Sequence, residues 1–169
     1  MAEVITGRQT AALDDEIVVF IIGMRINRLR SVRSWLPAFR AMPRMLRELG
    51  ADPALGLLNV QTLWAGRVFV GVQYWRSFDQ LEAFARSPDH EHLPAWREFN
   101  RLVRNNEHVG IFHETYRVAP GTAETFYGNM PAFGMAASVG IVPVAQRGQS
   151  AARRMGTTAT DEPAIAPPY

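Results

Sequence analysis

Hydrophobic positions follow two different periods along the first half of the chain. The stretch Glu16–Arg25, EIVVFIIGMR, is an almost continuous β-branched run, which predicts a central strand covered on both faces. A stripe at helical spacing follows and ends near Gly50, and Pro43 predicts a kink or break within this helix. The aromatic and methionine members of the stripe most simply belong to the core, and the alternative is that they line a substrate channel. The stripe consists of Trp35, Leu36, Phe39, Met42, Met45, Leu46 and Leu49.

A β-hairpin and two helices follow in the middle of the chain. Leu57–Trp64 and Arg67–Trp75 are strand-like runs on either side of Ala65-Gly66, which is suited to a hairpin turn. A serine at position 77 with a glutamine three residues later predicts a capping box that opens a short helix. A longer helical stripe then runs from Leu93 to Val103.

From His108 the hydrophobic period changes to two, which predicts a strand that ends near Val118. Odd-numbered residues, among them His113, fall on one face of this strand, and even-numbered residues, among them Glu114, fall on the other. Polar groups lie beside bulky apolar ones on both faces, which indicates that at least one face borders a covered, partly polar space. A short final strand is expected within Glu124–Asn129.

The order of these elements, β-α-β-β-α-β with one extra strand, is that of the ferredoxin-like α+β fold. In this fold the helices cover one face of an antiparallel sheet. Because the predicted strands are apolar on both faces, a second copy of the same sheet is the simplest cover for the other face. The sequence therefore predicts an obligate homodimer in which two sheets close a dimeric α/β barrel. The barrel interior would be an apolar chamber for a small-molecule substrate.

The two ends of the chain differ in composition from its middle. Residues 15–142 are expected to form the domain, and residues 1–14 a flexible N-terminal segment. Residues 143–169, rich in Ala, Gly, Gln, Thr and Pro, are expected to be a disordered tail. No segment has the length and apolarity of a membrane span, and no signal-peptide core is present, so we expect a cytoplasmic location and no membrane partner.

The amino-acid composition excludes several kinds of catalytic and metal-binding chemistry. The 169 residues contain no cysteine, which excludes disulfides, thiol catalysis and thiolate-ligated zinc, iron–sulfur or haem sites. All 18 basic residues are arginine, which excludes a Schiff-base lysine and a P-loop lysine. The net charge of +2 is too small to indicate a nucleic-acid partner.

Several stretches together resemble a bacterial family of unassigned function related to fungal and antibiotic-biosynthesis monooxygenases. They are GMRINRL, WLPAFRAMPRMLREL, VQYWRSFDQLEAFARSPDHEHLPAWREFN, VGIFHETYRV and YGNMP, and the match runs from about Val18 to Met135. The resemblance implies a dimeric α/β barrel. Relatives of that architecture include oxygenases that use no metal or flavin and haem proteins such as aldoxime dehydratases, and the fold alone hosts many unrelated activities.

The first functional hypothesis is a monooxygenase-like enzyme that binds a small, mostly apolar substrate without metal or flavin. It needs a base that forms a substrate carbanion in a chamber closed to water. Histidine titrates near neutral pH, so His113 is the first candidate. Glu114 or Tyr116 would orient a partner or hold a carbonyl, and Arg25 would stabilise an enolate. A strand histidine is also often structural, and adjacent residues point to opposite faces. The residues expected to bind the substrate are Trp75, Trp96, Asn27 and Phe112.

The second hypothesis is a haem protein of the same fold, with His92, His90 or His113 as the axial ligand. His90 and His92 lie two residues apart, so on a helix they diverge by about 200° and could not hold one metal together. A mononuclear zinc or iron triad is therefore disfavoured. The third hypothesis is a binding protein without catalysis, which would have the same cavity and no need of a base.

Overall fold

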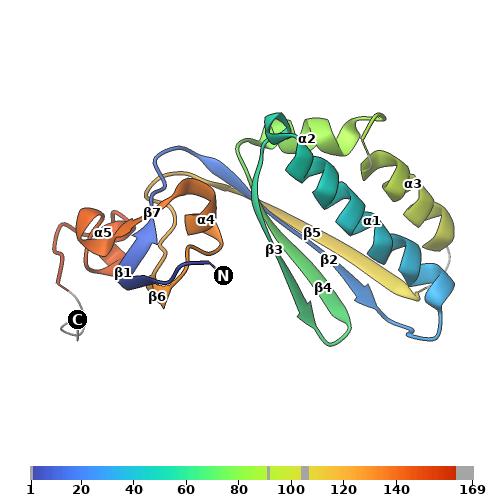
Figure 1. Ribbon diagram of the computed structural model, residues 1–169, viewed down its shortest axis with the longest axis horizontal. Helices are drawn as coiled ribbons and strands as arrows, with labels where there is room; N and C mark the ends of the chain where they lie inside the picture. Colours follow the sequence, from blue (N-terminus) through green and yellow to red (C-terminus); the bar gives the residue numbers. More distant parts are fainter. Residues whose placement is uncertain (1, 91, 104–106, 163–169) are drawn as a thin grey trace. The chain divides into compact units, whose positions relative to one another are not determined.

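The computed structural model describes residues 2–90, 92–103 and 107–162, which form two compact units. One, the central unit, consists of residues 18–116 (Figure 1). The other, the terminal unit, combines residues up to 17 with those from 117 onward. No helix among the described residues is long and apolar enough to cross a membrane.

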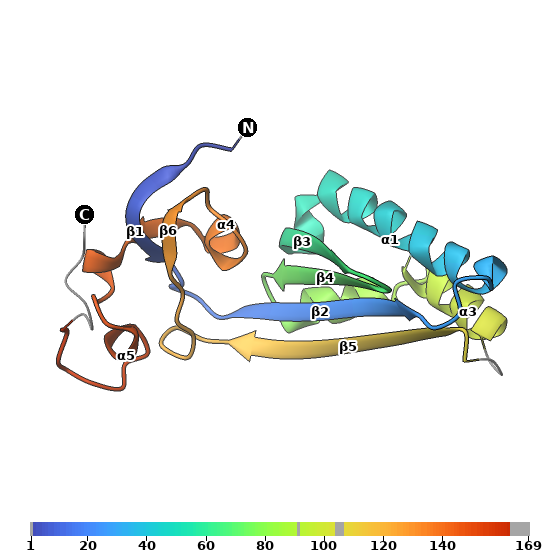
Figure 2. The same cartoon turned by 90° about the horizontal axis from the view of Figure 1, so that it is seen from below.

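The main sheet has four strands in the order β3-β4-β2-β5. Strand β4 pairs antiparallel with both β2 and β3. The predicted β3–β4 hairpin forms, and its turn lies at Gly66 and Arg67, one residue later than predicted. The helices lie on one face of this sheet (Figure 2). Element order and strand order together confirm the predicted ferredoxin-like α+β fold. The elements are β2 (Ile17–Ile26), α1 (Val32–Ala51), η1 (Pro53–Leu55), β3 (Leu57–Ala65), β4 (Val68–Trp75), α2 (Phe78–Arg86), α3 (His92–Val103) and β5 (Val109–Val118).

Two clusters of buried side chains join the helices to the sheet. In the first, Val18 of β2 and Trp75 of β4 pack against the α1 stripe and against α2. In the second, Met24 and Ile26 of β2 pack with Phe99 of α3. Even-numbered residues of β2 therefore face the helices, and the odd-numbered ones lie on the opposite, open face of the sheet. The remaining buried members are Ala41, Met45, Leu49, Leu81 and Phe84 in the first cluster and Val109 in the second.

The open face of the sheet is mostly apolar. Residues paired across two strands share a face, so Ile21 and its partner Val72, like Val19 and Tyr74, lie together there. Phe112 of β5 lies over Gly23, where any Cβ atom would clash with its ring. This glycine lets a large aromatic side chain approach the backbone of the sheet closely.

Helix α1 differs from its prediction, because it continues through Pro37 and Pro43 as one element of 20 residues. A proline at position 43 removes the hydrogen bond to the carbonyl four residues earlier, and a kink or a break was expected there. The helix does not break. Buried side chains on both sides of the proline, Ala41 before it and Met45 and Leu49 after it, pack in the same cluster. Their common packing surface stabilises helical structure on both sides of the proline.

The terminal unit corrects the expectation that both ends of the chain lack regular structure. Strand β1 (Ile5–Ala11) is the middle of a sheet of order β6-β1-β7, with β6 at Tyr127–Met130 and β7 at Ile141–Pro143. Arg154 is an example of the contacts that order residues 143–154. Its side chain is 7% exposed and contacts Glu124 and the carbonyls of Gly148 and Gln149. The short helices are α4 (Met135–Val139), η2 (Val144–Gln146) and α5 (Ala151–Arg154).

A buried hydrogen bond in the first cluster gives a test of the core. The indole nitrogen of Trp75 donates to Oε1 of Gln73 at 2.9 Å, and Gln73 is 5% exposed. We expect Gln73→Leu to lower the free energy of unfolding by about 1–3 kcal/mol, because it leaves the indole N–H unpaired. In a Trp75→Phe background, which lacks that N–H, the same change should cost much less. Equal losses in both backgrounds, measured by denaturant unfolding, would contradict this role.

Candidate active site

A cavity of about 540 Å³ lies between the helix-covered face of the sheet and helices α1 and α3. Its walls are almost wholly apolar, and all its lining residues belong to the central unit. The sheet contributes Ile22, Met24, Thr62, Trp64, Phe69 and Ile111. The helices contribute Phe39, Met42, Met45, His92, Trp96 and Phe99, among others. The space exists because Gly71 of β4 and Ala38 and Ala41 of α1 are small.

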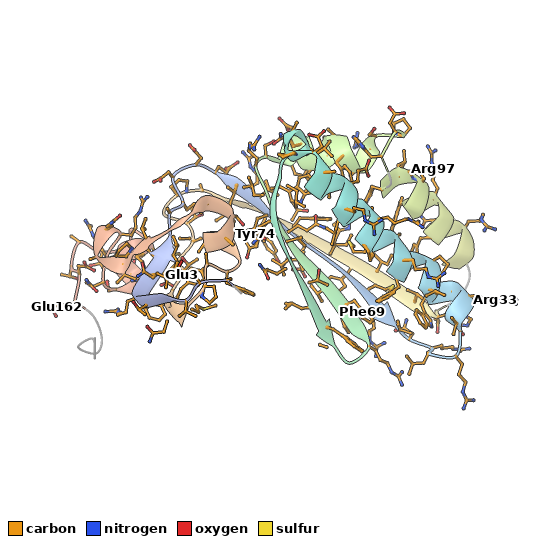
Figure 3. The ribbon with its side chains drawn as sticks, viewed as in Figure 1. Glu3, Arg33, Phe69, Tyr74, Arg97 and Glu162 are labelled. Carbon is orange, nitrogen blue, oxygen red and sulfur yellow. The ribbon has the colours of Figure 1, made fainter. Side chains whose placement is uncertain are left out.

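Two pairs of stacked aromatic rings form walls of this cavity. Trp64 stacks on Phe69 with ring centroids 5.3 Å apart and an angle of 17° between the planes. Figure 3 labels Phe69 on β4 near the hairpin turn. On α3, Trp96 stacks on Phe99 at 5.7 Å and 18°. Trp64 and Trp96 are 73% and 43% exposed although both line the cavity, so they lie where it meets solvent. Flat walls of this kind suit a planar, conjugated ligand.

His92 is the single residue with a titratable side chain among the described residues that line the cavity. Its Nδ1 lies 2.9 Å from the carbonyl oxygen of Ala85. A carbonyl can only accept a hydrogen bond, so Nδ1 carries the proton in neutral His92. The lone pair then lies on Nε2. This nitrogen can take a proton from a bound molecule or ligate a metal.

The predicted site residues on the helix-covered side of the sheet do not all reach the cavity. Trp96 lines it, as predicted for a substrate-binding residue, although its role stays a prediction. His113 lies beside Phe20, with ring centroids 5.7 Å apart, and is not among the lining residues. Trp75 is 1% exposed in the first core cluster, so it fills the core and does not form a wall of the cavity.

The other predicted site residues lie on or beside the open face. The hydroxyl of Tyr116 donates to Oε2 of Glu114 at 2.6 Å, and both belong to the same face of β5 as Phe112. At the end of β2, Arg25 donates to Oδ1 of Asn27, whose amide donates to the carbonyl of Glu107 at 2.8 Å. The sheet therefore separates this group from His92 and Trp96, and the predicted set does not form one site.

The two other histidines have structural partners. Nδ1 of His90 lies 2.8 Å from Oε1 of Glu48, and its ring stacks on Phe84. Nδ1 of His108 lies 3.1 Å from Oγ of Ser34. Within the described part of the chain, no group of three or more His, Asp or Glu residues could hold a metal ion.

Sequence reasoning missed Trp64 and Phe69 as parts of the cavity wall. These residues are paired on β3 and β4, so their shared face was available from the hairpin register. The channel alternative for the helical stripe matches the position of Phe39, Met42 and Met45, all of which line the cavity. The sequence pattern did not show which face of the sheet the helices cover, and the cavity lies on that face.

An apolar cavity under the helices of a ferredoxin-like sheet defines a class of small-molecule-binding α+β proteins. Residues 17–135 match the Monooxygenase af470-like family, and the chain belongs to this family. It is 28% identical over 152 residues to monooxygenase af470 of Aspergillus fumigatus, a match that covers 76% of this chain and 53% of the relative. The chain therefore spans about half the length of that curated relative.

Solved structures resemble the chain at low sequence identity. The aldoxime dehydratase OxdRE, in complex with butyraldoxime, has a TM-score of 0.58 and 18% identity, covering 82% of this chain and 42% of that one. SnoaB of Streptomyces nogalater, a cofactor-independent oxygenase, has a TM-score of 0.42 and 17% identity, covering 60% of this chain and 91% of that one. At such identity the likeness to OxdRE shows a shared fold.

The Tyr116–Glu114 contact predicts a titration. The hydrogen bond to Glu114, its negative charge and slight burial raise the pKa of Tyr116 above the ordinary value for tyrosine. Only the protonated phenol donates, so this contact stabilises the folded state below the ordinary pKa of about 10 and is lost as pH rises through the raised pKa. Glu114→Ala should lower the pKa of Tyr116 toward that ordinary value.

The measurement is the tyrosinate absorbance of each protein minus that of its Tyr116→Phe counterpart. Glu114→Gln, which removes the charge and keeps an acceptor oxygen, should give an intermediate pKa. An unchanged pKa in Glu114→Ala would show that the contact does not exist in solution.

Proposed function

We propose that the protein is a monooxygenase that oxidises a planar, mostly apolar organic substrate in the cavity under α1 and α3, without metal or flavin. One observation carries the proposal: a largely apolar cavity of about 540 Å³ has His92 as the single titratable side chain among its described lining residues. Membership of the af470-like monooxygenase family supports the oxidative chemistry. The cavity volume lies within the usual range of about 300–1,000 Å³ for small-molecule sites.

In the proposed reaction His92 acts as the general base through Nε2. It removes a proton from a carbon that an adjacent conjugated system makes acidic. The resulting carbanion reduces molecular oxygen, and recombination at the same carbon gives a hydroperoxide. Loss of water leaves a carbonyl group. One oxygen atom enters the product, the other leaves as water, and the substrate supplies all the electrons.

The surroundings of His92 fit this role. The hydrogen bond from Nδ1 to the carbonyl of Ala85 fixes the tautomer and the orientation of the ring. The stacked pairs Trp64–Phe69 and Trp96–Phe99 would hold a flat substrate against the imidazole. Apolar walls also keep water from the carbanion, which water would otherwise reprotonate.

The alternative function is that of a haem protein, which the lone pair on Nε2 of His92 also favours. His92 Nε2 is the described atom of the cavity lining best suited to ligate haem iron, which would supply redox or Lewis-acid chemistry when bound. The visible spectrum of protein expressed with iron and haem precursor separates the two proposals, because a Soret band appears only with haem. His113, the base predicted from the sequence, stays a candidate in either case.

A second copy of the chain is the proposed partner for the open face of the sheet. Val19, Ile21 and Val72 lie on that face, and the helices of the same unit cover only the other one. Apolar faces of this kind normally pack against another layer. The two sheets would then close a barrel across the dimer axis.

The catalytic proposal is tested with anthrone, a planar compound whose acidic methylene lies between two aromatic rings. Wild-type protein should consume oxygen and form the quinone, with one atom from labelled oxygen gas in the product. His92→Ala should lower the rate by about 10²–10⁴-fold, because the base is lost. His113→Ala is the matched control and should retain most of the activity.

Loss of activity in His113→Ala with His92→Ala unaffected would return the role of base to His113. Binding of anthrone without oxygen consumption would favour the non-catalytic binding protein.

The dimer proposal is tested by light scattering at micromolar concentration. Wild-type protein should give a mass near twice that of the 18.9 kDa chain. Val72→Glu, which places a charge on the open face, should shift the mass toward one chain, whereas Arg86→Glu on exposed α2 should not. A stable monomer of the wild-type chain would exclude the barrel.

A further inference from the structure

A second hollow, of about 630 Å³, lies between α1 and α3 and is lined from both helices. Three arginines of α1, Arg33, Arg40 and Arg44, contribute to its walls. Its apolar lining includes Leu36 and Pro37 of α1 and Pro94 of α3. None of its described lining residues is acidic. We call this hollow the arginine groove.

The spacing of the three arginines places them in one row. They follow each other after seven and four residues, so on a helix they lie within about 20° of a common line and span roughly 16 Å. Figure 3 labels Arg33 at the N-terminal end of α1. The helix contains four arginines and one glutamate, so its exposed side is strongly cationic.

The arginine groove adjoins the apolar cavity. Ala38, Ala41 and Phe99 line both spaces. The α1 residues that the two spaces share are alanines, so only small side chains of this helix lie between them. A molecule with an apolar body and a charged end matches the chemistry of the two neighbouring spaces together.

We propose that the arginine groove binds the anionic end, a phosphate or a carboxylate, of a substrate whose conjugated apolar part occupies the cavity. The inference rests on the proposed function, because it assigns the second half of the same substrate. Anion binding in the groove requires Arg33 and Arg40, which are exposed to solvent and available to an anion.

The chemistry of the groove suits this class of ligand. A planar guanidinium donates two parallel hydrogen bonds to a carboxylate or a phosphate, which a single ammonium group cannot do. Leu36, Pro37 and Pro94 supply apolar surface for the linking part of the molecule. The cavity itself offers no cationic side chain among its described lining residues, so an anionic end has its counter-charge only outside it.

The test uses a matched pair of fluorescent polyenes, cis-parinaric acid and its methyl ester, which differ in one charge. The proteins are the wild type, Arg33→Gln/Arg40→Gln, and the control Arg47→Gln. Arg47 is an exposed arginine of the same helix and is not among the groove's lining residues. Thermal unfolding of all three confirms that the changes leave the fold intact.

We expect the wild type to bind the acid about tenfold more tightly than the ester at low salt. The double variant should lose that preference by weakening acid binding alone, and Arg47→Gln should keep it. Added salt should weaken binding of the acid and leave the ester unchanged. Competition by dodecyl phosphate and dodecanoate, with dodecanol as the neutral reference, then shows which anion the groove prefers.

Each other outcome is decisive. Equal affinity for acid and ester, unchanged in the double variant, would overturn the arginine groove and leave the cavity and its proposed oxidation intact. Equal weakening by Arg47→Gln would show a general charge effect and would also overturn it. Failure of the neutral ester to bind the wild type would contradict the apolar cavity as a ligand site, and with it the proposed function.

Discussion

The packing of α1 across the sheet is the constraint on which the rest of the central unit depends. At one end of the sheet Trp75 and Phe84 fill the space under the helices, together with Met45 and Leu49. Further along, Gly71 of the strand and Ala38 of the helix are small and border the cavity, while Met24, Ile26 and Phe99 pack beside it in the second cluster. A rigid helix held at its large residues leaves a cavity at its small ones. Because α1 continues through Pro37 and Pro43, one helix spans both the packed end of the sheet and the cavity, and it thus helps to define the cavity.

The strands of the main sheet could be predicted from the sequence because the pattern that indicates each strand lies within that strand or in the turn beside it. The β-branched run of β2, the turn predicted at Ala65-Gly66 and the change of period at β5 each depend on neighbours in the chain. Strand β1 was missed because ITGRQTA has polar residues at most positions and gains its strand form from pairing with residues more than 100 positions away. Residues 143–154 of the expected disordered tail were mispredicted for a similar reason, since Arg154 contacts Glu124, which is distant in the sequence. Residues 163–169 of that tail lie outside the described residues.

The candidate site was harder to predict because strand parity alone does not reveal which face the helices cover. Parity correctly separated His113 from Glu114 and Tyr116, and the predicted chamber was the barrel interior between two chains, which stays a prediction. In the structure the cavity lies on the other side of the sheet, and its imidazole comes from the first residue of α3. Trp75 was misassigned because an aromatic residue at a strand end fits both a core and a cavity wall.

One face of the sheet borders the cavity and the other is open, because successive side chains along each strand point to opposite faces. Gly71 keeps space on the cavity side of β4, while its neighbour Val72 presents a branched side chain to the open side. On β5, Ile111 borders the cavity, and Phe112 lies close over Gly23 on the other face. A change of one residue in register would move each of these groups to the wrong face. Cavity and open face therefore depend on a single strand register, and neither can be altered by insertion without the loss of the other.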